Sequence, residues 1–179
     1  MKKTQIISGV LLLFLTGFTI IKAQKSPYKM DKEVIKVVYF NPEVFPNIEE
    51  IKEPTNEAFF DAISDNFGKL KKGKFLKAEN ETPFDEIDTL NIVEYCKNNN
   101  ADFAVVPKVK YFKVGLGKYV FSNQVVVSMK LFDSDGKYVA EASYDTYKKN
   151  MRMLGTTKNS IKIGTNGVFK EMLKKLKAL

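Results

Sequence analysis

The sequence contains no histidine and no tryptophan, and only one of its 179 residues is a cysteine. Without histidine, catalytic triads and dyads that use an imidazole base are excluded, and almost every transition-metal site is removed. One cysteine cannot form an internal disulfide, and carboxylates would have to hold a zinc ion alone, which is uncommon. We therefore predict no metal or cofactor site.

Proline and glycine are also scarce, with 6 and 10 residues, and the chain is 44% hydrophobic and 28% charged. This is the composition of an ordinary globular protein. A chain of this length can bury roughly 70% of its unfolded surface, so it needs no disulfide to be stable. The net charge is +8, which favours anionic partners.

The first 23 residues have the pattern of a signal peptide. Two lysines follow the first methionine, residues 6–21 carry no charge, and Ala23 is a small residue at a suitable cleavage point. The apolar run is shorter than the ~20 residues of a membrane-spanning helix, and an uncleaved anchor is the alternative. No cysteine follows the run, so lipidation is not expected. We predict a signal peptide over 1–23, a single domain over 24–179, and a periplasmic or secreted location.

Residues 101–147 have the clearest secondary-structure pattern and predict three consecutive strands. Apolar side chains alternate with polar ones from Phe103 to Tyr111 and from Val125 to Leu131, which is the period of a half-buried strand. Pro107 has no N–H, so it predicts a bulge or an edge. The third strand runs from about Lys137 to Tyr147. The opposite, polar side of the first two strands carries Lys108, Lys110, Gln124, Ser128 and Lys130.

The rest of the chain predicts two more strands and three helices. The strands are Val34–Phe40 and Phe75–Ala78. One helix is expected to begin at Thr55 as its cap, because Pro46 and Pro54 keep the preceding stretch irregular, and Gly68 and Gly73 mark its end. A second helix covers Asp88–Asn99, with Leu90, Val93 and Cys96 on its apolar stripe, and a last one covers about Ser160–Leu176 or begins only at Thr165.

The element order β-α-β-α-β-β-β-α predicts a mixed α/β fold. We expect a four- to five-stranded mixed sheet with helices packed on it.

Two stretches resemble a group of bacterial envelope domains. Ala101–Val106 has Ala-Asp before an apolar strand, and Leu131–Ala142 has Leu-Phe-Asp, then Asp-Gly-Lys at a turn and small residues. They are similar to the N-terminal domain of the TolB protein, the curli secretion channel protein and the lipoprotein activators of penicillin-binding proteins. The resemblance covers about Val34–Leu176 in element order. It implies an envelope adaptor, scaffold or assembly role without enzymatic activity.

Three short motifs have both a chemical and a structural interpretation. Asp133-x-Asp135-Gly136 could begin a calcium loop, but position twelve is Tyr144 where glutamate is required, so we prefer a tight hairpin turn. Gly115-x-Gly117-Lys118 precedes a strand, whereas a phosphate loop opens a helix, so we prefer a hairpin loop. Gly164–Gly167 lies near a helix start where an anion could bind, but we prefer close helix–sheet packing.

The lone cysteine and an acidic loop are the remaining candidates for chemistry. Cys96 lies on an apolar stripe and is predicted to be a buried, inert thiol. The loop carries Glu79, Glu81, Asp85, Glu86 and Asp88. Paired carboxylates hydrolyse glycosides when an apolar pocket raises one pKa, and Glu81, Asp85 and Glu86 are the candidates. Since no spacing fixes two of them, we interpret the loop as solvated.

Lysines cluster in two runs. The first contains Lys69, Lys71, Lys72, Lys74 and Lys77, and the second contains Lys170, Lys174, Lys175 and Lys177. Either could contact an anionic surface such as lipid head groups, lipopolysaccharide or an acidic protein, although a solvated face is preferred. Separately, Asp88-Thr89-Leu90 resembles a bacterial O-glycosylation motif with Thr89 as the acceptor.

These observations predict an exported cell-envelope binding or scaffold protein without enzymatic activity. We expect an envelope protein or a second copy of the chain as partner, no nucleic acid, and only peripheral membrane association. The alternative is a subunit of an oligomeric envelope assembly or secretion apparatus, which would use exposed strand edges or residues 111–121. A carboxylate-dependent exported hydrolase is the third hypothesis. No catalytic, cofactor-binding or metal-binding residue is predicted.

Overall fold

The computed structural model describes residues 34–116, 119–150 and 156–178. The predicted signal peptide and its cleavage point at Ala23 lie outside these residues. In chain order the elements are β1 (Ile35–Asn41), β2 (Glu43–Phe45), α1 (Glu49–Phe67), β3 (Gly73–Glu81), α2 (Thr89–Asn99), β4 (Phe103–Leu116), β5 (Tyr119–Asp133), β6 (Tyr138–Asp145), α3 (Thr146–Asn150) and α4 (Thr157–Ala178).

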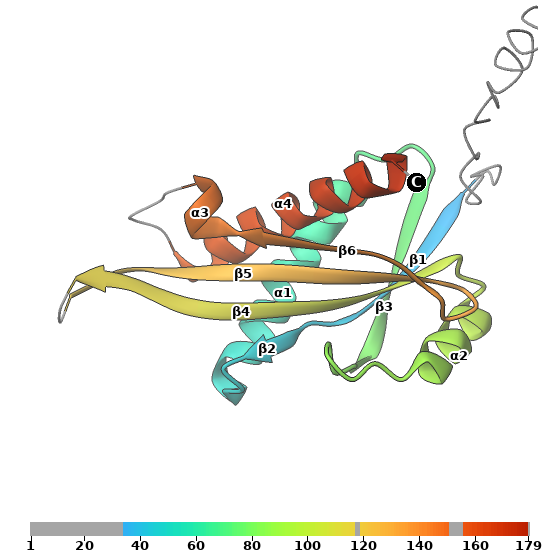
Figure 1. Ribbon diagram of the computed structural model, residues 1–179, viewed down its shortest axis with the longest axis horizontal. Helices are drawn as coiled ribbons and strands as arrows, with labels where there is room; N and C mark the ends of the chain where they lie inside the picture. The colour runs from blue at the N-terminus through green and yellow to red at the C-terminus, as the bar shows by residue number, and fades with distance from the viewer. Residues whose placement is uncertain (1–33, 117–118, 151–155, 179) are drawn as a thin grey trace, which may run out of the picture.

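The strands form one mixed sheet in the order β3-β1-β4-β5-β6, with β2 also paired to β4. β1 is parallel to both β3 and β4, whereas β4, β5 and β6 are joined by antiparallel hairpin connections. Figure 1 shows β4, β5 and β6 running across the picture while β3 runs up it, so the sheet is strongly twisted. The predicted mixed α/β class is confirmed, and β2 adds a sixth strand to the four or five expected.

Helices cover both faces of the sheet. α1 and α4 pack on one face, where Tyr39, Val109 and Met129 meet Phe59 and Phe169 in the larger core. α2 covers part of the other face through a smaller core. That core is formed by Val38, Phe40, Ala78, Phe84, Ile92, Cys96, Ala101, Ala104, Val106 and Phe132. β1 and the start of β4 are therefore buried on both faces, which explains their nearly continuous apolar sequences.

Pro107 lies at the point along β4 where the neighbouring strand changes from β1 to β2. β1 pairs with Phe103–Val105, and β2 pairs with Lys108–Lys110. Pro107 falls between these two segments, so its missing N–H removes no ladder bond to either neighbour. The pairing of β4 with β5 runs past Pro107 without a shift in register, so the predicted bulge is absent; the predicted partial edge is present, because neither β1 nor β2 pairs with β4 at this proline.

The turn between β5 and β6 is closed by its own backbone and by Asp133. The Asp133 N–H donates to the Lys137 carbonyl at 3.0 Å, and the carboxylate Oδ1 accepts from the N–H groups of Asp135 and Lys137 at 3.1 and 2.9 Å. Gly136 has a φ of 76°, a conformation that glycine adopts without steric cost. The predicted hairpin turn is confirmed.

The start of α1 was predicted wrongly. The helix begins at Glu49 and contains Pro54, whereas a start at Thr55 was expected. Thr55 is buried, and its hydroxyl donates to the Ile51 carbonyl at 2.5 Å and also bonds the Tyr111 hydroxyl on β4. Pro54 lies near the N-terminus of the helix, where it removes a single backbone bond. Tertiary contacts of Thr55 therefore outweigh the local signal of the proline.

The other corrections concern which side chains are buried. Leu90 is 77% exposed, and α2 instead packs through Ile92 and Cys96, which are four residues apart on one face. Gln124, expected on the polar side of β5, is 1% exposed because its Oε1 accepts from the buried Thr146 hydroxyl at 2.7 Å. α4 begins at Thr157, earlier than the predicted Ser160 or Thr165.

Candidate functional site

An apolar cavity of about 380 Å³ opens at one end of the sheet, on the face covered by α1 and α4. Its floor is made by Tyr39, Val105 and Leu131 from three neighbouring strands. The remaining lining residues come from β1, α1, the α1–β3 turn, the first residues of β3 and β4, and α4: Ile35, Val37, Phe67, Leu70, Lys71, Lys72, Gly73, Phe103, Phe169, Met172, Leu173 and Leu176. Volumes of 300–1,000 Å³ and mostly apolar walls are typical of small-molecule sites.

The local sequence explains why the chain turns at the mouth of this cavity. α1 ends at Phe67, and Gly68 caps it through bonds to carbonyls of the last turn. The first residue of β3, Gly73, passes close to Phe67, since a Cβ at Gly73 would lie 3.1 Å from the Phe67 ring. A glycine lets the strand approach the helix end. The short turn between them places Leu70 and two lysines at the opening.

The cavity wall is rigid on its aromatic side. The Tyr39 ring contacts Phe67 and Phe75 edge to face, with ring centroids 5.9 and 6.3 Å apart. Phe67 also meets Phe169 of α4 at 5.7 Å. Such edge-to-face pairs stabilise a defined arrangement beyond the burial of their area. Burial raises the pKa of the Tyr39 phenol, so this hydroxyl stays protonated at all physiological pH values.

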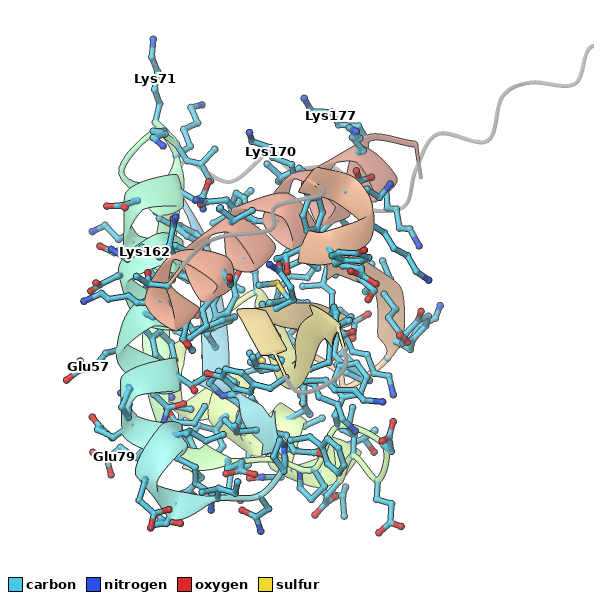
Figure 2. The ribbon with its side chains drawn as sticks, turned by 90° about the vertical axis from the view of Figure 1, so that its left-hand side faces the viewer. Glu57, Lys71, Glu79, Lys162, Lys170 and Lys177 are labelled. Carbon is cyan, nitrogen blue, oxygen red and sulfur yellow. The ribbon has the colours of Figure 1, made fainter. Side chains whose placement is uncertain are left out.

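Positive charge gathers at the mouth. Lys71 and Lys72 line the opening and are solvent-exposed, and no aspartate or glutamate is among the described lining residues. Figure 2 shows Lys71, Lys170 and Lys177 pointing outward from the same end of the molecule, with Glu57 and Glu79 toward the other end. Of the predicted anionic-surface lysines, Lys71 and Lys72 therefore reach the cavity. Lys69 and Lys74 are exposed neighbours that do not line it.

On the opposite face of the sheet, a cluster of charged side chains holds the acidic loop in place. The Lys108 ammonium lies 2.7 Å from Asp85 Oδ2 and 3.1 Å from Glu43 Oε1. The Phe84 N–H donates to Glu43 Oε2 at 2.6 Å, and Lys130 donates to the Phe84 carbonyl at 2.8 Å. The Lys130 ammonium also lies 4.2 Å from the centroid of the Phe84 ring. The loop is thus held by charge around one buried aromatic anchor.

We expect acid to loosen this loop. The hydrogen bond from Lys108 lowers the pKa of Asp85 below its usual value. A carboxylate with a lowered pKa contributes fully above the unfolded-state pKa of about 3.9, and its contribution is lost as pH falls through the folded-state value. NMR titration of the Phe84 ring resonances should show the change in this acidic window. The same titration of Lys108→Met should lack it; an identical profile in both proteins would contradict the prediction.

The carboxylates of the hydrolase hypothesis lie around one cavity of about 370 Å³. Glu81, Asp85 and Glu86 line it together with Glu43. Burial raises the pKa of Glu81, whereas Lys108 lowers that of Asp85. Opposite shifts of this kind are a feature of acid–base pairs. Asp85, however, is already paired with Lys108, and Glu86 is exposed.

Cys96 and the two glycines of α4 have structural roles, whereas Thr89 lies on the surface. Cys96 is buried, and burial raises the pKa of its thiol to about 11, which confirms the buried thiol. Gly164 and Gly167 lie inside α4, where a Cβ would come within 2.6 Å of Val127 and 2.3 Å of Tyr144, so they serve close helix–sheet packing. Thr89 is exposed at the first residue of α2.

Three further findings concern the predicted motifs and the membrane. Gly115 of the predicted Gly115-x-Gly117-Lys118 loop lies in β4, while residues 117 and 118 are outside the described part of the chain.

Of the second lysine run, Lys174 is paired with Glu171 at 3.4 Å, and Lys175 donates to the Glu141 carbonyl at 2.5 Å. Within the described ranges, no helix is both long enough and apolar enough to span a membrane.

The cavity itself was not predicted from the sequence. Its lining residues come from β1, α1, the α1–β3 turn, β4, β5 and α4, and each is an ordinary core residue within its own element. The signal that pointed toward it was the lysine run from Lys69 to Lys77, which was interpreted as a solvated face or an anionic-surface contact. Two of those lysines lie at the cavity mouth.

No family model matches the chain, and no curated protein sequence matches it. Several solved bacterial structures are similar to it in fold. The PelC dodecamer from Paraburkholderia phytofirmans is 13% identical, with a TM-score of 0.49, over 76% of this chain and 86% of that one. A putative neuraminyllactose-binding hemagglutinin homolog from Helicobacter pylori is 12% identical, with a TM-score of 0.42, over 84% and 89%. Lipoprotein GNA1162 from Neisseria meningitidis is 10% identical, with a TM-score of 0.39, over 78% and 99%. Since these TM-scores are below 0.5, the likenesses carry no functional argument.

Proposed function

We propose that the protein is an exported cell-envelope binding protein without enzymatic activity, and that its ligand occupies the apolar cavity. The observation that supports this most directly is the cavity of about 380 Å³, with aromatic and aliphatic walls and two lysines at its mouth. The cavity is open to solvent, so its apolar wall stays in contact with water until a ligand covers it. A ligand with an apolar part would remove this surface from water, which is favourable.

Export is supported by the sequence of residues 1–23, with its positive start, uncharged apolar run and Ala23. We propose that cleavage near Ala23 releases the domain to the periplasm or the outside of the cell. Fractionation of cells that produce the tagged protein, followed by N-terminal sequencing, tests this. A cytoplasmic protein with its first residues intact would exclude the export proposal.

The resemblance to envelope domains supports the same compartment. Ala101–Val106 begins β4, and Leu131–Ala142 spans the β5–β6 turn. The resemblance of Leu131–Ala142 to the TolB N-terminal domain and its relatives implies a hairpin, and this stretch closes a turn at Asp133 and Gly136. We infer a TolB-like envelope role from this resemblance. Retrieval of envelope proteins by the tagged protein from its own membranes would support the role.

Filling the cavity should weaken ligand binding. We predict that Ile35→Trp lowers the affinity for the neutral apolar dye N-phenyl-1-naphthylamine at least tenfold, because the indole occupies the space between the strand and the end of α4. Dye fluorescence measures binding. Val34→Trp is the matched control, since Val34 is the adjacent residue, is exposed and does not line the cavity. Equal binding by both variants, with unchanged thermal unfolding, would contradict the cavity as the site.

The alternative of an oligomeric assembly subunit depends on the sheet edges. β3 and β6 are the terminal strands of the described sheet. Edge strands pair readily with other chains unless they are protected, and lysines such as Lys74 and Lys77 on β3 are a common protection. β6, and the outer edge of β2, which pairs only with β4 in the described sheet, are therefore the edges that this alternative would use. Cross-linking at native abundance separates the two proposals, because a monomer excludes the assembly subunit.

The absence of enzymatic activity is proposed together with binding. If the carboxylates lining the 370 Å³ cavity were catalytic, Glu81→Gln, Asp85→Asn and Glu86→Gln together should abolish hydrolysis of an envelope glycan. We expect wild-type and triple-variant proteins to give the same background turnover. A wild-type rate above background that the triple variant loses would establish the hydrolase instead.

A further inference from the structure

We infer that the ligand of the apolar cavity is a fatty acid of about twelve carbons, with its chain inside and its carboxylate at Lys71 and Lys72. This inference rests on the proposed function, since it names the chemical class of the ligand for the same site. It follows from the volume of the cavity, the position of its charges and the shape of its opening.

The volume selects one chain. A methylene group occupies about the space of a water molecule, roughly 30 Å³, so a cavity of about 380 Å³ holds roughly twelve of them. At the same volume per group, two acyl chains of about sixteen carbons each would need between two and three times this space. A diacyl lipid is therefore too large to enter with both chains, whereas a single medium-length chain fills the void.

The charges select the head group. Among the described residues that line the cavity, Lys71 and Lys72 carry the charge, and both belong to the α1–β3 turn. Within the described residues neither lysine has a carboxylate partner, so both ammonium groups are available. Lysine ammonium groups act as compact point charges, which suits a small anion. A carboxylate at the opening would neutralise this charge without entering the apolar interior.

The arrangement of polar and apolar groups sets the orientation. The deep residues Val105 and Leu131 are buried, whereas the lysines are at the solvent-exposed rim. An ionised group would lose its hydration at the floor without gaining a charged partner. The chain must therefore enter methyl end first. Figure 2 shows the neighbouring Lys170 and Lys177 at the same end, which adds long-range attraction for an anion.

The inference is tested with a series of fatty acids of increasing chain length. Titration calorimetry of the purified protein with octanoate, decanoate, dodecanoate and tetradecanoate, each below its micelle concentration, should show affinity rising about threefold to fourfold per added methylene. The rise should stop near twelve carbons, where the cavity is full. Dodecanol should bind at least tenfold more weakly than dodecanoate, and dodecyltrimethylammonium more weakly still. An affinity that does not depend on chain length would overturn the inference.

Charge reversal tests the role of the lysines. Lys71→Glu with Lys72→Glu should lower dodecanoate affinity at least tenfold and leave dodecanol affinity unchanged. The matched control is Lys97→Glu with Lys137→Glu, two exposed lysines on the α2 side that change the net charge equally; it should bind dodecanoate like the wild type. If both double variants lose equal affinity, the two rim lysines do not hold the head group.

The outcomes separate this inference from the proposed function. Equal binding of dodecanol and dodecanoate would overturn the anionic head group and leave an apolar binding site in place. Dodecyl phosphate binding more than tenfold tighter than dodecanoate would overturn the carboxylate. If neither the chain series nor N-phenyl-1-naphthylamine binds, the proposed function fails as well.

Discussion

Replacing Phe59 by alanine is expected to lower the free energy of unfolding by about 3–5 kcal/mol, the usual cost of removing a buried aromatic ring. Phe59 is fully buried in the larger core. Its ring centroid lies 6.4 Å from that of Tyr39 and 5.3 Å from that of Phe60. Alanine would leave a cavity that the rigid sheet beneath α1 cannot close. Urea unfolding followed by circular dichroism measures the change.

Phe60 provides the matched control for Phe59. The two are adjacent in α1, but Phe60 is only partly buried, and the Lys77 ammonium covers its ring at 4.7 Å from the centroid. Phe60→Ala should lower the free energy of unfolding by only about 1 kcal/mol, because the Phe60 side chain buries less apolar area than that of Phe59. If Phe60→Ala costs as much as Phe59→Ala, the helix does not face the sheet as described.

Gly167→Ala is expected to destabilise the protein by about 2–3 kcal/mol, although alanine is the better helix former. A Cβ at this position would lie 2.3 Å from Cδ2 and 2.4 Å from Cγ of the Tyr144 ring. These atoms are near the backbone of β6, so the ring cannot simply swing away. α4 or β6 must move instead. The free energy of unfolding in urea again measures the cost.

Two comparisons isolate the steric cause at Gly167. Gly68→Ala should be neutral within about 0.5 kcal/mol, because its Cβ would meet the Ser64 carbonyl at 3.4 Å and its φ of −58° suits any residue. Tyr144→Ala should remove most of the additional cost of Gly167→Ala, so the two changes should not be additive. Additive losses would show that the ring is not the obstacle.

The strands of 101–147 and the turn between β5 and β6 were predictable because their signals are local. Alternation of apolar and charged residues sets which side of β4 and β5 faces the core, and Asp133 and Gly136 close their turn with bonds inside the turn. α2 was equally predictable, since Asp88 accepts a bond from the Leu90 N–H as an N-cap and Asn100 ends the helix in the left-handed conformation.

Signals that depend on distant residues were not predictable. Thr55 has the sequence character of a cap but bonds within the helix and to Tyr111, which is 56 residues away. Gln124 is polar, yet it is buried because Thr146 lies beside it in the folded protein. Leu90 is apolar, yet it faces solvent, because α2 packs on the sheet through Ile92 and Cys96 and this leaves Leu90 on the outer side of the helix.

The candidate site likewise combines one feature that local sequence reveals with one that depends on distant residues. The lysine run from Lys69 to Lys77 could be found in the sequence, because charge is a property of consecutive residues. The cavity could not, because its wall joins β1 to α4 across more than a hundred residues.

By itself, the sequence determined the mixed α/β class, the three-stranded ribbon with its turn, and the absence of histidine chemistry, since each depends on residue types or on neighbours along the chain. Only the tertiary structure decided that Lys71 and Lys72 stand at the mouth of an apolar cavity. That arrangement exists because the end of α4 packs beside the α1–β3 turn over the sheet (Figure 1), and no local pattern specifies which distant segments meet.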